Sequence, residues 1–251
     1  MNFIDVLSSK LAPCLTCPPP HPIRVETIAL ADKSQLVLVL DNVLSPSECL
    51  ALINASECKG YEAALIHMGG GRQVLCTDMR NNDRCILDDR DAATIIWDRI
   101  RPFLPATFEG NDVIGINERL RFLRYGPGQE FKPHFDGCFT RPTEPTEVSF
   151  LTIQFYLNGG KQKLVGGATT IFDGPNQVQI HPTAGRVLVF QHNGVWHAGS
   201  PVVAGRKYTI RSDIMCRLSP NYIRTPQNSP DNYSHEDTAP RTGRCRRLRQ
   251  N

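Results

Sequence analysis

Apolar and polar residues alternate with a period of two in short runs along the second half of the chain, which is the pattern of half-buried β-strands. The runs lie at residues 119–125, 147–157, 168–172, 178–181, 186–191 and 207–216, and turns rich in Gly and Pro separate them. Short strands at this spacing predict a mainly β (α+β) protein built as an antiparallel sandwich or barrel.

The first half of the chain carries the signals for two helices, and a strand at 35–40 precedes them. Residues 45–48 supply a serine N-cap, a proline at the first helical position and a glutamate at N3, which predicts a helix to about residue 58. Apolar residues recur at helical spacing over 91–101, which predicts a second helix. Each helix has an apolar face, so we expect both to pack against the sheet.

These elements divide the 251 residues into four segments. We expect a Pro-rich N-terminal arm (1–25), a supporting region of helices and strand packed on the core (26–116), and a β-rich core (117–218). The last segment, an Arg-rich tail (219–251), contains few residues to bury, so we expect it to be disordered.

The charge distribution argues against a nucleic-acid platform. The net charge is +3, and removing the five arginines of 241–251 leaves a body near −2. A near-neutral body does not provide the basic surface that nucleic-acid binding requires. We interpret the arginine tail as a solvated or localising segment, with nucleic-acid contact through the tail as the alternative.

Cysteine usage and apolar runs predict a cytoplasmic protein, with a nuclear location as the alternative. The nine cysteines are scattered, and the start of the chain lacks the basic residues and long apolar stretch of a signal peptide. Cys14 and Cys17 form a C-x-x-C without a second pair at zinc-binding spacing, so we expect reduced thiols. No apolar run is long enough to cross a membrane, so we expect no membrane partner.

Two histidines and an aspartate are the candidate metal ligands. His134 and Asp136 are two residues apart, so on a strand their side chains point to the same side. His197 lies about sixty residues further on, in a different predicted strand. Two imidazoles and one carboxylate are the facial ligand set of non-haem iron(II) oxygenases, and the absence of thiolate favours Fe(II) over a structural zinc site. His192 is the competing choice for the distal ligand.

Lys207 follows His197 by ten residues and lies on the polar face of a predicted strand, with Thr209, Arg211 and Asp213. A lysine facing the interior is costly to bury without an anion. The distal carboxylate of 2-oxoglutarate would be that anion, with Lys207 acting alone or with Thr209 or Arg211. The alternative is that this face points to solvent.

The strand predicted at 147–157 has a similar division. One face is uniformly apolar, while Thr152, Gln154 and Tyr156 place hydrogen-bonding groups on the other. The polar face fits a ligand cavity, although it would equally fit the solvated side of a sheet.

Taken together, these segments resemble the prolyl 4-hydroxylase-like branch of the 2-oxoglutarate/Fe(II)-dependent dioxygenase superfamily, across residues 37–217. The resemblance lies in RYGPGQEFKPHFD, the glycine pair of VGGATTIF, PTAGRVLVFQH and WHAGSPVVAGRKYTIRSDIM. Their order and spacing match jointly.

The resemblance implies a double-stranded β-helix (jelly roll) with helices supporting one side. It implies iron held by His134, Asp136 and His197, Lys207 on the C5 carboxylate of 2-oxoglutarate, and Tyr125 lining the cofactor pocket. Fe(II), 2-oxoglutarate and O2 are then the cofactors, with ascorbate as reductant. Relatives that halogenate lack the carboxylate ligand, so Asp136 favours hydroxylation.

The predicted function is therefore hydroxylation of an unactivated C–H bond, on a protein side chain or a small molecule, with release of succinate and CO2. Collagen is not the expected substrate, because neither a secretion signal nor a peptide-binding domain is evident. We interpret the segment 137–145 as a substrate-covering loop or a plain connection. The alternatives are a non-catalytic jelly-roll module that binds or senses a ligand, and an oxidative demethylase of nucleic acid.

Overall fold

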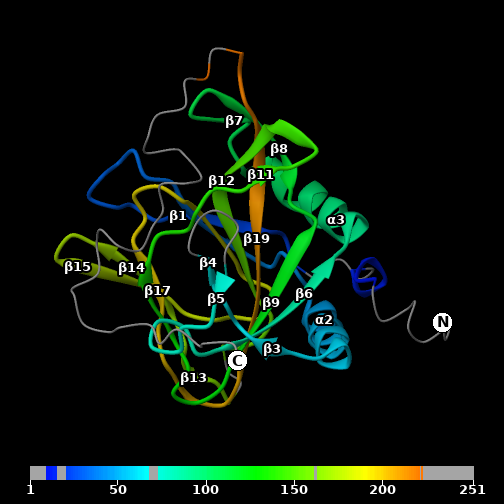
Figure 1. The fold of residues 1–251 in the computed structure, drawn as a ribbon, viewed down its shortest axis with the longest axis vertical. Coiled ribbons are helices and arrows are strands. Elements are labelled where there is room, and N and C mark those ends of the chain that lie inside the picture. Colours follow the sequence, from blue (N-terminus) through cyan, green and yellow to red (C-terminus); the bar gives the residue numbers. More distant parts are fainter. Residues whose placement is uncertain (1–9, 16–20, 68–72, 161–162, 221, 223–251) are drawn as a thin grey trace, which may run out of the picture.

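The computed structural model describes residues 10–15, 21–67, 73–160, 163–220 and 222. The chain folds into two facing antiparallel sheets with helices on the outer side of the larger one (Figure 1). The larger sheet runs in the order β1-β2-β16-β12-β19-β9-β6-β3. The smaller sheet runs in the order β10-β17-β14-β15. The prediction of a mainly β jelly roll with supporting helices is confirmed.

The main strands of the larger sheet are β1 (Arg24–Thr27), β2 (Val37–Asp41), β3 (Glu62–Ala63), β6 (Asp83–Asp88), β9 (Arg119–Tyr125), β12 (Glu144–Tyr156), β16 (Val187–Gln191) and β19 (Lys207–Arg217). Three strands extend one end of it: β7 (Thr107–Phe108), β8 (Asn111–Ile116) and β11 (Thr140–Arg141). The smaller sheet contains β10 (Phe131–His134), β14 (Thr169–Asp173), β15 (Asn176–Ile180) and β17 (His197–Gly199). Two short hairpins pair β4 (Ile66–His67) with β5 (Gln73–Val74) and β13 (Val165–Gly166) with β18 (Val202–Ala204).

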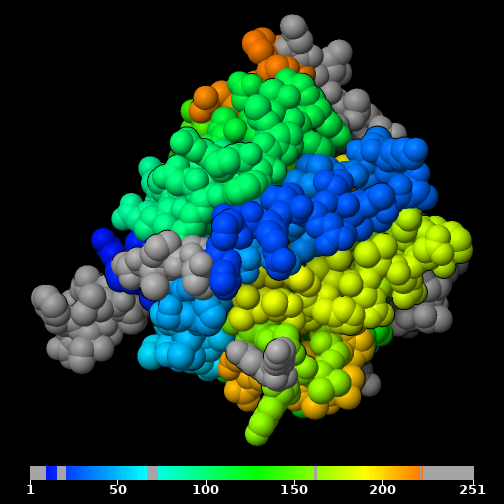
Figure 2. All heavy atoms as spheres, turned by 180° about the vertical axis from the view of Figure 1, so that it is seen from behind, coloured from blue at the N-terminus to red at the C-terminus, as the bar shows by residue number. Residues whose placement is uncertain are grey.

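Both helices cover the outer face of the larger sheet, as predicted. They are α2 (Pro46–Lys59) and α3 (Arg90–Ile100), accompanied by the 3-10 turns η1 (Ala12–Cys14) and η2 (Arg101–Phe103). The capping box at the start of α2 is present. Its glutamate, Glu48, is buried and forms an ion pair of 2.7 Å with Arg99 of α3, so the two helices are joined beneath the sheet. From behind, the blue segment of β1 and β2 lies between the green region of α3 and the yellow-green strands near β15 (Figure 2).

Alternation along the central strands sends their two faces to different environments. The apolar face of β12, formed by Leu151, Ile153, Phe155 and the following Leu157, lies in the main core with the helices. The opposite face looks toward the smaller sheet, where Tyr156 packs with Ile171 and Ile180. On β19, Ile210 and Ile214 likewise join the main core. The polar faces of both strands are therefore enclosed between the sheets and are not solvated.

Several short strands were not predicted, among them β6 and β8. The predicted arm also ends earlier than expected, because β1 begins at Arg24 and pairs with β2. The supporting region contributes β2, β6 and β8 to the same sheet as the core. The segment 137–145 is held to β12 through β11, and Arg141 forms ion pairs with Glu118 and Glu147.

Most of the described cysteines are reduced, as predicted. Cys14, Cys49, Cys58, Cys85, Cys138 and Cys216 are free. Cys76 is disulfide-bonded, so the expectation of reduced thiols is wrong there. No helix within the described ranges is long and apolar enough to cross a membrane. Cys17 and the arginine tail 241–251 lie outside the described residues, so their predicted roles remain predictions.

We predict that Gly185→Ala destabilises the fold by about 3 kcal/mol or more, because a non-glycine residue is strained there and its Cβ meets backbone. Gly185 has φ +81°, and an added Cβ would lie 2.1 Å from the carbonyl oxygen of Leu44. Gly110 is the matched control, since it has φ +75° and open space around the added atom. Gly110→Ala should cost only about 1 kcal/mol. Urea denaturation measures both, and equal losses would contradict the close-contact argument.

Candidate active site

The three predicted metal ligands converge at one end of the smaller sheet. His134 ends β10 and His197 begins β17, and the two residues are directly paired across the antiparallel strands. Asp136 follows β10 by two residues, and its side chain is 13% exposed. Strand pairing therefore brings together residues that are about sixty positions apart in sequence.

The ligand atoms of these side chains all lie within 4.8 Å of one another. His134 Nε2 is 3.8 Å from Asp136 Oδ1, and His197 Nε2 is 3.7 Å from Asp136 Oδ2. Within the described part of the chain, no other group of three or more His, Cys, Asp or Glu side chains is placed to hold a metal. Two imidazole nitrogens and one carboxylate oxygen without thiolate fit Fe(II).

Backbone carbonyls orient both imidazoles. His134 Nδ1 lies 2.8 Å from the oxygen of Lys132, and His197 Nδ1 lies 3.1 Å from the oxygen of Val195. A carbonyl only accepts, so each Nδ1 carries the proton and each Nε2 keeps its lone pair for a metal. Burial lowers the pKa of both histidines, that of His134 well below its ordinary value, so both rings are neutral.

Asp136 is held as a carboxylate by its neighbours. Burial alone would raise its pKa, but Arg211, followed by His197 and His134, holds that pKa well below the usual value. Arg211 Nη2 lies 3.3 Å from Asp136 Oδ1, and Thr152 Oγ1 donates a hydrogen bond of 2.5 Å to Asp136 Oδ2. Both carboxylate oxygens are therefore fixed before any metal binds.

The charge network continues beyond Arg211 to residues that sequence reasoning did not assign to the site. Arg211 Nη1 lies 3.1 Å from Asp213 Oδ1, and Arg121 Nη1 lies 3.1 Å from Asp213 Oδ2. Asp213 is 1% exposed, so its two arginines supply the compensation that a buried carboxylate needs. Local alternation identified Asp213 as facing the same way as Arg211, but only pairing of β9 with β19 shows that Arg121 joins them.

Lys207 lies on the same face of β19, nearer the start of the strand. The residue is 2% exposed, and burial lowers the pKa of its ammonium group to about 7. Its Nζ lies 5.1 Å from the ring centre of Tyr125 and 5.7 Å from that of Tyr156. Within the described ranges, no carboxylate forms an ion pair with this ammonium group. A buried cation without an anion is the environment that a carboxylate ligand would complete.

The second glycine of the pair noted in the sequence, Gly167, packs against this lysine. Gly167 has φ +71°, and an added Cβ would lie 3.1 Å from Lys207 Cδ and 3.1 Å from Val202 Cγ2. A side chain at this position would press on the aliphatic stem of the lysine. Gly167 therefore keeps room for Lys207 to extend between the sheets.

The predicted cofactor residues form two groups. Tyr125 and Tyr156 surround Lys207, whereas Arg211 and Thr152 contact Asp136. The hydroxyl of Tyr156 donates to Thr169 Oγ1 over 2.7 Å, which orients its ring. The competing histidine, His192, is not part of the metal cluster.

Arg80 is a further cation at the site, and its sequence context gave no signal. Its guanidinium lies 4.6 Å from the ring centre of Phe131, which stacks on His134 at 3.6 Å. Burial raises the pKa of the Tyr125 hydroxyl, and the nearby positive charge of Arg80 opposes that rise. Backbone pairing of Arg80 with Phe131 holds it there, so its place depends on a loop contact between distant segments.

Comparison with known proteins agrees with this geometry. Residues 120–212 match the family described as the 2OG-Fe(II) oxygenase superfamily. That segment contains His134, Asp136, His197, Lys207 and Arg211. No curated protein matches the sequence.

Solved prolyl hydroxylases share the fold. A prolyl-4-hydroxylase of Pseudomonas putida is 18% identical with a TM-score of 0.54, covering 81% of this chain and 98% of its own. A prolyl hydroxylase of Trichoplax adhaerens, solved with a peptide fragment of the hypoxia inducible factor oxygen degradation domain, is 14% identical with a TM-score of 0.53. That match covers 85% of this chain and 93% of the other.

Residues 120–212 therefore form a 2-oxoglutarate/Fe(II)-dependent oxygenase domain, and the chain has the fold of the prolyl 4-hydroxylases. It is a 2-oxoglutarate-dependent, non-haem iron enzyme. The predicted cofactors Fe(II), 2-oxoglutarate and O2 are confirmed at the level of this family, while ascorbate remains a prediction.

The buried Lys207 should make the stability of the fold depend on pH. Because folding lowers the pKa of Lys207 from 10.5 to about 7, the cost of burying its charge is complete below pH 7. That cost fades as pH rises toward 10.5. Lys207→Met should raise the free energy of unfolding of the metal-free chain by about 3 kcal/mol at about pH 6. Most of this gain should be lost at about pH 9.5.

Denaturation curves at the two pH values measure this difference. Lys132→Met is the control, because Lys132 is an exposed lysine on β10 and should give no pH-dependent change. A Lys207→Met variant that is equally stable relative to the parent at both pH values would contradict the buried, unpaired ammonium.

Proposed function

We propose that this enzyme hydroxylates an unactivated C–H bond on a protein side chain, with a prolyl ring as the leading candidate, and releases succinate and CO2 from 2-oxoglutarate. The observation that carries the proposal is the buried Lys207 ammonium, which no carboxylate of the described residues pairs, on the strand whose Arg211 contacts Asp136. A peptide substrate is supported by the shared fold with the Trichoplax adhaerens enzyme, which was solved with a peptide.

In this proposal, His134, Asp136 and His197 hold the iron. The carbonyl contacts at each Nδ1 direct both Nε2 atoms to the metal, and Thr152 and Arg211 fix the plane of the carboxylate. With iron and 2-oxoglutarate bound, the site activates dioxygen to oxidise a C–H bond. The protein contributes preset ligand geometry, so little reorganisation is needed when the metal enters.

Lys207 is proposed to anchor the distal carboxylate of 2-oxoglutarate between the rings of Tyr125 and Tyr156. The anion would restore the charged form of the lysine, because an opposite charge raises a depressed lysine pKa. Arg211 already forms ion pairs with Asp136 and Asp213, so its charge is compensated and it is not the principal anchor. Its proposed role is to position Asp136.

The first test concerns the metal ligand. Asp136→Ala should abolish iron retention and the formation of succinate, because it removes the only carboxylate of the ligand set. Metal analysis after gel filtration and succinate release measure the two effects. Asp91→Ala, on the surface of α3, is the matched control and should change neither. Full turnover by Asp136→Ala would exclude the proposed iron site.

The second test concerns the cosubstrate anchor. Lys207→Met should retain iron but weaken binding of 2-oxoglutarate by about 100-fold, since a buried charge pair is lost. Calorimetry with N-oxalylglycine, a non-reacting analogue of 2-oxoglutarate, measures this affinity in the manganese-loaded protein. Lys207→Arg should restore part of it by returning the charge. Unchanged affinity in Lys207→Met would move the anchor to another cation, such as Arg80.

A further inference from the structure

Asp213 is a buried carboxylate that does not itself belong to the metal cluster. It lies on the same face of β19 as Arg211, and Arg121 of β9 is paired directly opposite Arg211. Like charges that face each other across two strands repel, and burial strengthens the repulsion. Asp213 contacts both arginines, with Oδ1 3.1 Å from Arg211 Nη1 and Oδ2 3.1 Å from Arg121 Nη1. The carboxylate is therefore the shared counterion of the two arginines.

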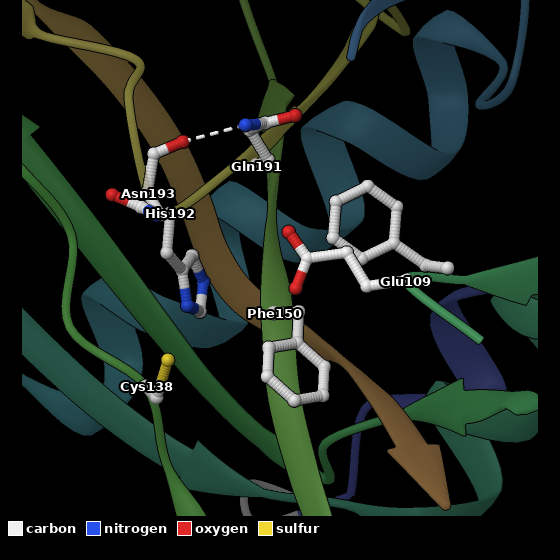
Figure 3. A pocket seen from close by; sticks show the side chains of 7 residues that line it. Glu109, Cys138, Phe150, Gln191, His192 and Asn193 are labelled. Atoms are coloured by element: carbon white, nitrogen blue, oxygen red, sulfur yellow. Dashed lines mark hydrogen bonds between the residues drawn. The ribbon is translucent and has the colours of Figure 1, made fainter. Parts of the chain in front are cut away.

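The other contacts of Asp213 are uncharged. Asn117 Nδ2 donates to Oδ2 over 3.4 Å, and His192 Nε2 lies 3.8 Å from Oδ1. Burial lowers the pKa of His192 to about 4, so its ring is neutral. His192 lines a small pocket with Cys138, Phe150 and other residues, and no lysine or arginine is among the described residues that line it (Figure 3). Within the described part of the chain, the two arginines are thus the charged partners of Asp213.

Arg211 divides its guanidinium group between two carboxylates. Nη1 faces Asp213, while Nη2 lies 3.3 Å from Asp136 Oδ1 and donates to Thr152 Oγ1 over 3.3 Å. A guanidinium group often pairs with one carboxylate through two parallel N–H···O contacts. Here Asp136 receives only one nitrogen of the arginine, and its other oxygen accepts a hydrogen bond from Thr152. This division leaves both oxygens of Asp136 facing imidazole nitrogens of the metal cluster.

Asp136 is the only other carboxylate among the described residues that forms an ion pair with Arg211. If Arg211 closed on both oxygens of Asp136, it would occupy the lone pairs that a metal needs. We propose that Asp213 is a positioning residue that holds Arg211 to a single contact with Asp136 and so keeps this ligand available to iron. The inference rests on the proposed function, because it concerns the iron site that this function requires.

Titration of the full chain with cobalt(II), without 2-oxoglutarate, tests this arrangement. Cobalt(II) takes the same nitrogen and oxygen ligands as Fe(II), and its visible absorption reports binding. Asp213→Asn should weaken cobalt binding by about 10- to 100-fold, because residues that orient metal ligands have effects of this size. Asp213→Glu keeps the negative charge and should restore most of the affinity.

Two double variants separate this mechanism from a general effect of charge. Asp213→Asn/Arg211→Gln and Asp213→Asn/Arg121→Gln each remove one negative and one positive charge, so their net charges are equal. Only the first should recover most of the lost cobalt affinity, because Arg211, and not Arg121, contacts Asp136. Equal recovery in both variants would mean that net charge alone sets the affinity. No recovery in the first would mean that Asp213 has only a structural role, and either result overturns the inference.

Arg121→Gln alone tests the inference even if Asp213→Asn does not fold, which thermal denaturation reveals. This variant leaves Asp213 free to hold Arg211, so cobalt affinity should stay at or above that of the parent. A clear loss of affinity would overturn the inference. Asp83→Asn is the matched control, because it removes a carboxylate that lies 2.9 Å from Arg124 elsewhere in the same sheet. It should leave cobalt binding unchanged.

Asp136→Ala distinguishes failure of this inference from failure of the proposed function. If cobalt binds this variant with unchanged affinity, the metal lies elsewhere, and the proposed function falls together with the inference. If Asp136→Ala loses cobalt while Asp213→Asn binds it as tightly as the parent, the iron site stands and only the role of Asp213 is refuted.

Discussion

The site depends on the ammonium group of Lys207, which is enclosed between two sheets and has no carboxylate partner in the part of the chain that the structure describes. A charge in that position is costly, and the fold tolerates it because Tyr125 and Tyr156 offer their ring faces and Gly167 leaves space for the stem. The lysine therefore makes the interior attractive to a carboxylate of defined position. Since Lys207 and Arg211 lie on one strand, the rise of β19 sets the spacing between the anchor and the arginine that contacts Asp136.

Buried charge is balanced differently along β19. Near the iron ligands, Asp136, Arg211, Asp213 and Arg121 alternate in sign, so each buried charge has an opposite neighbour. At the anchor end, no carboxylate within the described ranges pairs with Lys207. This buried cation fits the distal carboxylate of an acidic cosubstrate.

Local patterns predicted the elements that have enough length to show a period. The capping box of α2, the amphipathic α3 and the long strands β9, β12, β16 and β19 all agree with their predicted segments within a few residues. The short strands β10 and β17 were expected around His134 and His197, but their bounds were not predicted. Three or four residues do not establish a period, and β10 is interrupted by Pro133 and irregular pairing. These strands form because they pair with each other and because β17 also pairs with β14.

The sequence by itself determined the chemistry of the site: the ligand types, the lysine ten residues beyond the distal histidine, and the polar faces of two strands. Those are properties of residue identity and of alternation within one strand. Only the tertiary structure decided that Arg211 and Thr152 serve Asp136 while the tyrosines surround Lys207. It also brought in Arg80, Arg121 and Asp213. Each of these depends on pairing or loop contacts between segments distant in sequence, and no local pattern encodes such a distance.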